Sequence, residues 1–223
     1  MKYLKVLIPV LLVVGLMMGC AQKPPTVTKV DPAMASSAGG TGVTITGTGF
    51  KTTPAPTVTV GGAPATDVKA VSKTSLKATV PSGSAGPADI VVQNAKAKVK
   101  SMPFKGFQYY DDVAVISKNP DPAMADPDGI DAPAKIDVTF NQDVDAATVM
   151  IKVTDADGGE VAGEVMQDVT DTKMFSFTPG STMPAGMYTV TVSGAQSMSS
   201  MMAMPADDTF SFTVKAAAKK GRR

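Results

Sequence analysis

Short segments in which apolar and polar residues alternate recur from residue 26 to residue 214, and residues that favour turns separate them. Residues 43–46 (VTIT) and 136–140 (IDVTF) are two of these segments. A period of two places every second side chain on the same face of an extended chain, which is typical of a β-strand with one buried face. Because 20 Gly and 17 Pro residues supply turns between such segments, we predict an all-β chain.

The charge of the chain changes sign near residue 110. Residues 21–110 carry ten Lys and three Asp, a net charge of +7, whereas residues 111–214 carry four Lys and seventeen Asp or Glu, a net charge of −13. A shift of this kind marks a candidate domain boundary. We therefore predict two tandem β-sandwich domains, residues 25–110 and 113–214, followed by a basic tail at residues 215–223. With Cys20 as the only cysteine, no disulfide can staple either domain, so each must bury a core of its own.

The first twenty residues resemble an export signal. Lys2 and Lys5 precede an apolar run at residues 6–18, which is shorter than the roughly 20 residues of a membrane-spanning helix. The run ends in LMMGC, which resembles the lipobox of bacterial lipoproteins. That resemblance implies cleavage after residue 19, lipid attachment to Cys20 and a short linker at residues 20–24. The alternative is an ordinary secretory signal that ends beside an unpaired Cys.

A lipid anchor at Cys20 would make the membrane a partner of this chain. Two or three acyl chains hold a protein stably on a bilayer, whereas a single chain does not. We therefore expect a protein tethered in the cell envelope. Ala21 stands where lipoproteins retained at the inner membrane often have Asp, so we favour the outer membrane or the cell surface.

Turn glycines and strand residues of the first predicted domain follow a characteristic order. They are Pro32, Gly39, Gly40, Thr41, Val43, Ile45, Gly47, Phe50, Val58, Val60, Gly61, Gly62, Val71, Ser72, Ser75, Val80, Pro81, Gly86, Val91 and Asn94. In order and spacing they resemble the IPT/TIG immunoglobulin-like domain. The resemblance implies a small β-sandwich used in protein contacts, and it brings no catalytic site. From the residues themselves we predict a loop at residues 31–42 and a hairpin over residues 57–68, with Gly61 and Gly62 as its tight turn.

The second predicted domain has a different pattern of strand and turn residues. They are Pro120, Ile136, Val138, Phe140, Asp143, Asp145, Phe177, Pro179, Gly186, Tyr188, Val190, Val192, Phe210 and Phe212. These residues resemble a bacterial immunoglobulin-like domain of the kind found in S-layer and secreted proteins. Within it we predict one short helical turn at residues 141–149 and a hairpin over residues 150–165, centred on Asp157 and Gly158.

Enzyme chemistry is disfavoured by what the sequence lacks. The chain contains no His, which excludes Ser-His-Asp and Cys-His catalytic groups and imidazole metal ligands. Glu occurs only at positions 160 and 164, and the Asp residues cluster in predicted turns. We predict a non-enzymatic protein without a cofactor and without a nucleic-acid partner.

Two sets of residues are candidates for metal binding. Asp126, Asp128, Asp155 and Asp157 lie in turns with oxygen atoms at alternate positions, as in calcium loops, although solvated turns explain them better. The second set is Met198, Met201, Met202 and Met204, whose thioethers suit Cu(I). Exported copper carriers with Met-rich loops on a similar β-sandwich make this hypothesis worth testing. The scatter of Met along the chain favours the alternative, in which Met fills irregular apolar gaps in place of Leu.

We therefore predict a non-enzymatic envelope lipoprotein. Its immunoglobulin-like domains would act as an adhesion, assembly or spacer module that contacts an envelope or extracellular protein. The alternative is a ligand-capturing lipoprotein that binds calcium through the Asp-rich turns or Cu(I) through the Met-rich loop.

Overall fold

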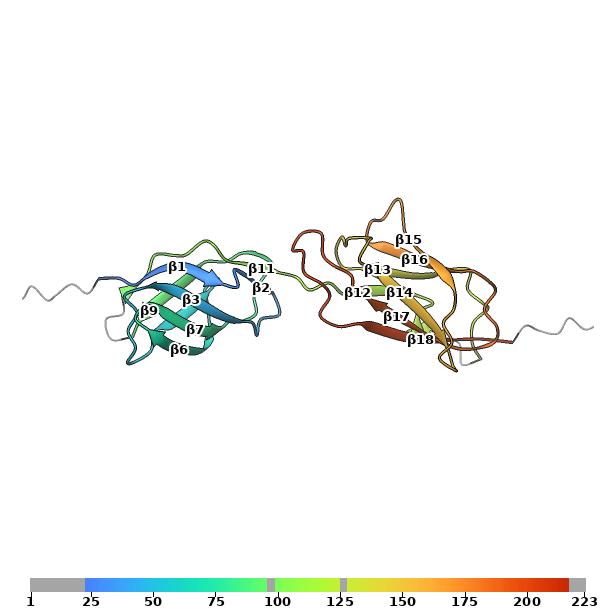
Figure 1. Cartoon of the computed structure of the whole chain (residues 1–223), viewed down its shortest axis with the longest axis horizontal. Helices are drawn as coiled ribbons and strands as arrows, with labels where there is room; N and C mark the ends of the chain where they lie inside the picture. The colour runs from blue at the N-terminus through green and yellow to red at the C-terminus, as the bar shows by residue number, and fades with distance from the viewer. Residues whose placement is uncertain (1–22, 96–98, 125–127, 217–223) are drawn as a thin grey trace, which may run out of the picture. The chain divides into compact units, whose positions relative to one another are not determined.

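The computed structural model of the chain describes residues 23–95, 99–124 and 128–216 (Figure 1). Apart from one short 3-10 helix, η1 (Pro122–Met124), the regular elements of these residues are strands. The chain divides into two compact units, Met1–Asp111 and Asp112–Arg223. Within the described ranges, no helix has both the length and the apolar composition needed to cross a membrane. The predicted fold class, all-β with two β-sandwich domains, is confirmed.

Two four-stranded sheets build most of the first unit. One has the order β1-β3-β7-β6 and the other β10-β9-β4-β5, and a smaller sheet has the order β2-β11-β8. The strands are β1 (Thr26–Asp31), β2 (Met34–Ser36), β3 (Gly42–Thr48), β4 (Thr57–Val60), β5 (Ala63–Pro64), β6 (Thr66–Ser72), β7 (Ser75–Thr79), β8 (Gly86–Pro87), β9 (Ile90–Asn94), β10 (Val99–Lys100) and β11 (Gln108–Tyr110).

The core of the first unit lies between its two larger sheets. Ile45 and Leu76 from one sheet and Ile90 from the other are fully buried, as the alternating pattern predicts. The rings of Phe107 and Tyr109 meet edge to face at 5.4 Å. The Tyr109 hydroxyl donates a hydrogen bond of 2.8 Å to the carbonyl oxygen of Pro81, and burial raises the pKa of this hydroxyl.

Two local predictions for the first unit need correction. Residues 31–42 form no continuous loop, because β2 pairs in parallel with β11. Gly61 and Gly62, both with positive φ, do turn β4 into β5 as predicted. The segment after this turn does not stay with β4, because β6 crosses to the other sheet and pairs with β7. A chain that changes sheets covers both faces of the core, which a single hairpin cannot do.

The second unit is a sandwich of a four-stranded and a three-stranded sheet. The orders are β12-β13-β16-β15 and β14-β17-β18, and every pairing within them is antiparallel. The strands are β12 (Val115–Asn119), β13 (Ile136–Phe140), β14 (Met150–Asp155), β15 (Gly163–Gln167), β16 (Met174–Pro179), β17 (Gly186–Ser193) and β18 (Asp208–Val214).

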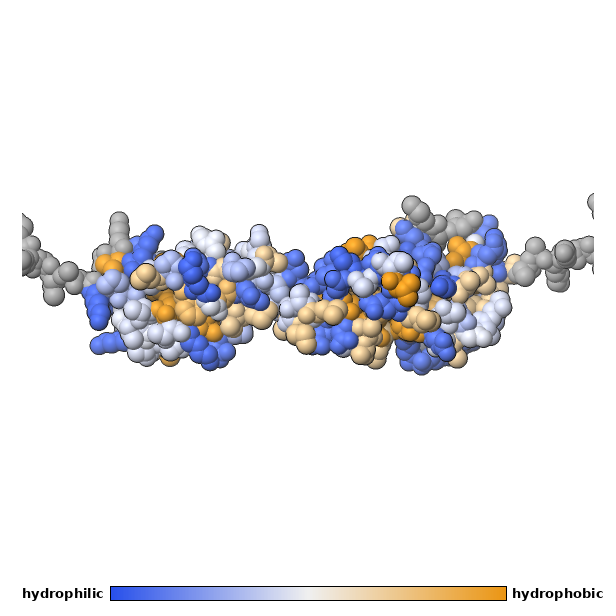
Figure 2. All heavy atoms as spheres, turned by 90° about the horizontal axis from the view of Figure 1, so that it is seen from above, coloured by the Kyte–Doolittle hydropathy of each residue, from blue (hydrophilic) through white to orange (hydrophobic). Residues whose placement is uncertain are grey.

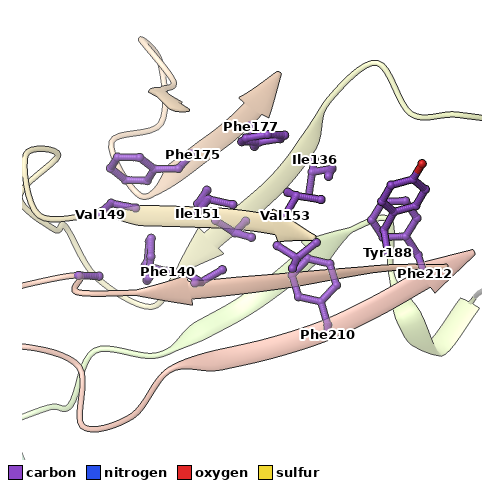
Figure 3. Close-up of a cluster of buried hydrophobic side chains, with 14 of the residues drawn as sticks. Ile136, Phe140, Val149, Ile151, Val153, Phe175, Phe177, Tyr188, Phe210 and Phe212 are labelled. Carbon is purple, nitrogen blue, oxygen red and sulfur yellow. The ribbon is translucent and has the colours of Figure 1, made fainter. Parts of the chain in front are cut away.

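Aromatic side chains from both sheets fill the core of the second unit (Figure 3). The rings of Phe140 and Phe175 meet edge to face at 5.7 Å, and those of Tyr188 and Phe212 stack at 5.8 Å. Truncating a buried Phe to Ala costs about 3–5 kcal/mol, so this cluster is a main source of the unit's stability.

The structure also corrects two predictions for the second unit. Residues 150–165 are not a hairpin: β14 pairs with β17 and β15 pairs with β16, so the two strands lie in different sheets. Only the Thr154–Glu160 bridge joins them next to the turn. Residues 141–149 contain no helix but one hydrogen-bonded turn, in which the Thr148 amide donates to the Asp145 carbonyl and the Ala147 amide to the Asp145 carboxylate, both at 3.0 Å.

Candidate functional site

Methionine dominates the exposed apolar surface of the described residues. Seven of the eleven large hydrophobic side chains that are exposed there are Met: Met102, Met150, Met166, Met187, Met198, Met201 and Met202. Figure 2 shows such hydrophobic residues scattered among hydrophilic ones on the visible face of each unit. The alternative that Met mainly fills core gaps holds for Met183, which is buried. It fails for most of the others.

The candidate copper ligands lie on residues 194–204, the methionine loop, which form most of the connection between β17 and β18. Met198, Met201 and Met202 are 62%, 64% and 42% exposed. Met204, in contrast, is partly buried and packs against the core of the unit. The loop therefore presents three thioethers to solvent and is held to the domain by the fourth methionine.

Backbone hydrogen bonds give this loop a defined shape. The amide of Ser197 donates to the Met202 carbonyl at 2.9 Å, and the Met201 amide donates back to the Ser197 carbonyl at 3.0 Å. The Met204 amide donates to the Ala195 carbonyl at 2.8 Å. Met201 has a φ of 60°, a conformation that non-glycine residues adopt at a cost. The loop is thus folded back on itself, and its exposed Met residues start from fixed backbone positions.

Ser197 is the buried centre of this loop. Its hydroxyl donates to the Gln142 side-chain oxygen at 2.9 Å and accepts from the amides of Ser199 and Ser200 at 3.2 and 3.3 Å. Since a buried hydroxyl needs such partners, this network fixes the turn that carries Met198 and Met201.

Neighbouring loops hold the loop at one end of the sandwich. The Met198 amide donates to the Asp143 carbonyl at 3.1 Å, and the Thr172 hydroxyl donates to the Asp143 carboxylate at 2.6 Å. Asp143, Lys173 and Met198 line a shallow pocket of about 380 Å³ together with Gln142 and Ser199. Met198 therefore lies beside a carboxylate and an ammonium group.

Met150 is a neighbour of the loop that sequence reasoning missed. It begins β14, is 59% exposed, and pairs with Ser193, the last residue of β17. A Cβ atom at Gly194 would lie 3.1 Å from the Met150 methyl group and 2.6 Å from the Thr148 carbonyl oxygen. The glycine thus lets the thioether of Met150 approach the base of the loop. The sequence signal was the alternation of β14, which puts Met150 on the outer face.

The turn that follows Gln167 is closed by a carboxylate near the same end. Asp168 accepts hydrogen bonds from the hydroxyl and the amide of Thr170 and from the amide of Asp171. These bonds, the Thr170 hydroxyl first, lower the pKa of Asp168 below its usual value.

The aspartates predicted for calcium are engaged in turns where they are described. The Asp155 carboxylate accepts the amides of Asp157 and Gly159 at 3.1 and 2.7 Å. Asp128 is exposed, and Asp126 lies outside the described residues. Across residues 23–95, 99–124 and 128–216, no three His, Cys, Asp or Glu side chains group to hold a metal. Calcium binding stays a prediction.

Cys20 and most of the basic tail also lie outside the described residues. The lipid anchor therefore remains a prediction.

Comparison with known protein families assigns both domains. Residues 25–109 match the IPT/TIG domain, which confirms the resemblance found in the sequence. Residues 121–215 match the CopC domain. The chain thus matches an IPT/TIG domain followed by a CopC domain. The S-layer type predicted for the second domain was wrong, because its strand pattern reports only the sandwich core and not the loops that distinguish such families.

Solved structures give a similar comparison. The chain is 27% identical to PcoC, a methionine-rich copper resistance protein from Escherichia coli, with 47% of this chain and 99% of PcoC covered and a TM-score of 0.40. It is 17% identical to CopC from Methylosinus trichosporium OB3b, with 48% and 97% covered and the same TM-score. A search of curated proteins found no match to the chain.

Proposed function

We propose that this chain is an exported copper-binding protein whose CopC domain carries Cu(I) on the loop of residues 194–204. The ligands are Met198, Met201 and Met202, with Met150, whose methyl group lies beside Gly194 at the base of the loop, as a further candidate. The observation that carries the proposal is the exposure of three thioethers on one hydrogen-bonded loop. The CopC match favours this alternative over the adhesion module predicted from the sequence.

The chemistry of the available donors selects the oxidation state. The chain contains no His, so it offers no imidazole, the ligand that suits Cu(II) as well as several other metals. Thioethers are neutral, soft donors that select Cu(I). The donor set therefore fits Cu(I). Because the sulfur atoms are exposed, transfer of the Cu(I) ion to another protein is favoured.

The charge of the CopC domain assists capture of a cation. Residues 111–214 carry a net charge of −13, and the Asp143 backbone and carboxylate lie next to Met198. A field of this sign raises the local concentration of cations and speeds their encounter with the site. Because neutral thioethers contribute no charge of their own, the surrounding carboxylates supply the attraction.

We assign the IPT/TIG domain a spacer role between a lipid anchor at Cys20 and the copper-binding domain. The export signal predicted at residues 1–19 supports a place in the cell envelope. Because the chain contains no His, we propose that the protein acts as a carrier and not as an enzyme.

Competition with a Cu(I) chelator tests the proposal. The variant M198L/M201L/M202L/M150L removes the four exposed thioethers near the loop, and we expect it to lose its Cu(I) while it remains folded. The matched control is M102L/M166L/M187L, which removes three exposed thioethers elsewhere and should retain the copper of the wild type. Equal retention by the two variants would refute the loop as the site.

A further inference from the structure

A groove in the first domain combines apolar and cationic side chains. It has a volume of about 520 Å³ and lies between the start of β1 and the segment that follows β10. Pro24, Met102, Pro103 and Phe104 supply apolar walls. Nothing in the proposed copper chemistry uses this groove, which belongs to the other domain.

The apolar wall of the groove is held on a fixed backbone. Phe104 and Ile90 exchange two backbone hydrogen bonds of 2.9 and 3.0 Å, and the Phe104 side chain packs against the core of the first domain. Met102, two residues earlier, is 85% exposed. Holding such an apolar side chain in water is unfavourable, so Met102 gains from any contact that covers it.

Lysines surround these apolar residues. Lys23 and Lys105 line the groove, and the Lys105 side chain is 80% exposed with its nearest carboxylate, Asp89, at 4.0 Å. Lys100 and Met102 flank the buried Ser101, so both side chains point outward from the same extended segment. The groove thus presents a positive, partly apolar face.

The position of the groove along the chain identifies its partner. Lys23 follows the predicted lipid attachment site, Cys20, by three residues, which span at most about 10 Å. An anchor at Cys20 would therefore hold the groove within reach of the lipid headgroups. The acidic CopC domain, in contrast, would be repelled by an anionic bilayer.

We propose that this groove docks on the surface of an anionic lipid bilayer, with Met102 at the headgroup level and Lys23, Lys100 and Lys105 facing lipid phosphates. A basic patch adds to the membrane affinity that acyl chains provide, and the groove supplies such a patch. The inference rests on the groove and on the predicted place of Cys20, and it is independent of copper binding.

Vesicle binding by a chain that begins at Ala21 tests the proposal without the lipid. This chain keeps every described residue. The probe is a vesicle of phosphatidylcholine with about a quarter phosphatidylglycerol, compared with pure phosphatidylcholine. We expect binding to the anionic vesicles only, and we expect it to weaken when the ionic strength rises from about 0.1 to about 0.5 M.

Charge-reversal variants locate the surface. K23E/K105E should lower the partition coefficient roughly 30-fold or more, because each lysine lost near an anionic surface costs about fivefold. The control K69E/K77E makes the same charge change on β6 and β7, at the far edge of the sheet from β1, and should lower binding by less than about threefold. M102Q keeps the charge and should weaken binding severalfold. Equal losses in the two double variants, or no binding of the wild type, would overturn the proposal.

Discussion

Replacing Ser197 with Ala removes the hydroxyl at the centre of the methionine loop. It leaves the four exposed thioethers, those of Met150, Met198, Met201 and Met202, in place. Ser197 is 1% exposed. Its hydroxyl makes side-chain hydrogen bonds of 2.9 Å with Gln142 and 3.0 Å with the Ser199 hydroxyl, and accepts two longer ones, of 3.2 and 3.3 Å, from backbone amides. Alanine supplies none of these partners, so the turn that presents Met198 and Met201 loses its internal support.

The size of the effect follows from these bonds. A buried hydrogen bond contributes about 1 kcal/mol, and the two longer bonds contribute less each. We expect the free energy of unfolding of the CopC domain to fall by about 1–2 kcal/mol. For a domain of this size, that loss lowers Tm by roughly 4–12 °C. If ordering the loop then costs about 1 kcal/mol of the free energy of Cu(I) binding, the Cu(I) affinity falls about fivefold.

Calorimetry of the metal-free protein measures the first effect, and chelator competition measures the second. Ser211→Ala is the matched control, because Ser211 shares only an exposed hydrogen bond of 3.1 Å with Thr189. It should change stability by less than about 0.5 kcal/mol. A Ser197→Ala protein that unfolds at the wild-type temperature and binds Cu(I) equally well would refute the view that this network orders the loop.

Three further predictions concern the CopC domain. Lys118→Ala should lower the free energy of unfolding by about 1–3 kcal/mol, because it leaves the partly buried Asp208 carboxylate without its ammonium partner at 2.6 Å. The control Lys152→Ala breaks an exposed pair and should lower it by under about 0.5 kcal/mol. Equal losses in thermal unfolding would contradict this account. The pKa of Asp168 lies below its usual value, so its turn is fully stabilised above about pH 4 and loses this stabilisation as the pH falls through the lowered pKa; an amide NMR signal of Thr170 that titrates above pH 4 would contradict this. Cu(I) affinity should be constant from about pH 5 to 8, since thioethers bind no proton in this range; a tenfold fall at low pH would point to other ligands.

Local periodicity was enough to predict the longer strands of both domains, but not short ones such as β2. Ile136, Val138 and Phe140 alternate in the sequence and are all fully buried in β13. The glycine pair at 61 and 62 likewise predicted a tight turn, because positive φ angles are needed there. Such features depend on residues close together in the chain, so the sequence alone reveals them.

Pairing over long distances was not predictable in the same way. Residues 150–167 contain two strands around a tight turn, which is also what a hairpin looks like in sequence. The structure instead pairs Ile151 with Val192 and Val165 with Phe177, because each strand completes a different layer over the shared core. Choosing between these arrangements requires the packing of residues that are far apart in the chain.

Residue type in the sequence identified the candidate ligands, but the sequence did not show which of them are exposed. Met198 and Met204 look alike in the sequence, yet one thioether is exposed and the other packs against the core. Met150 became a candidate only in the structure, where the pairing of β14 with β17 places it at the base of the loop. Thus the sequence indicated the chemistry of the donors, and the fold indicated which donors a metal can reach.

X-ray absorption at the copper edge of the protein loaded with one equivalent of Cu(I) tests the central claim most directly. The account predicts a first shell of sulfur alone, with about three thioethers, and predicts that the M198L/M201L/M202L/M150L variant gives no such shell. The M102L/M166L/M187L variant should reproduce the wild-type spectrum. A first shell of oxygen or nitrogen ligands, or a sulfur shell that persists in the loop variant, would contradict copper binding by the methionine loop.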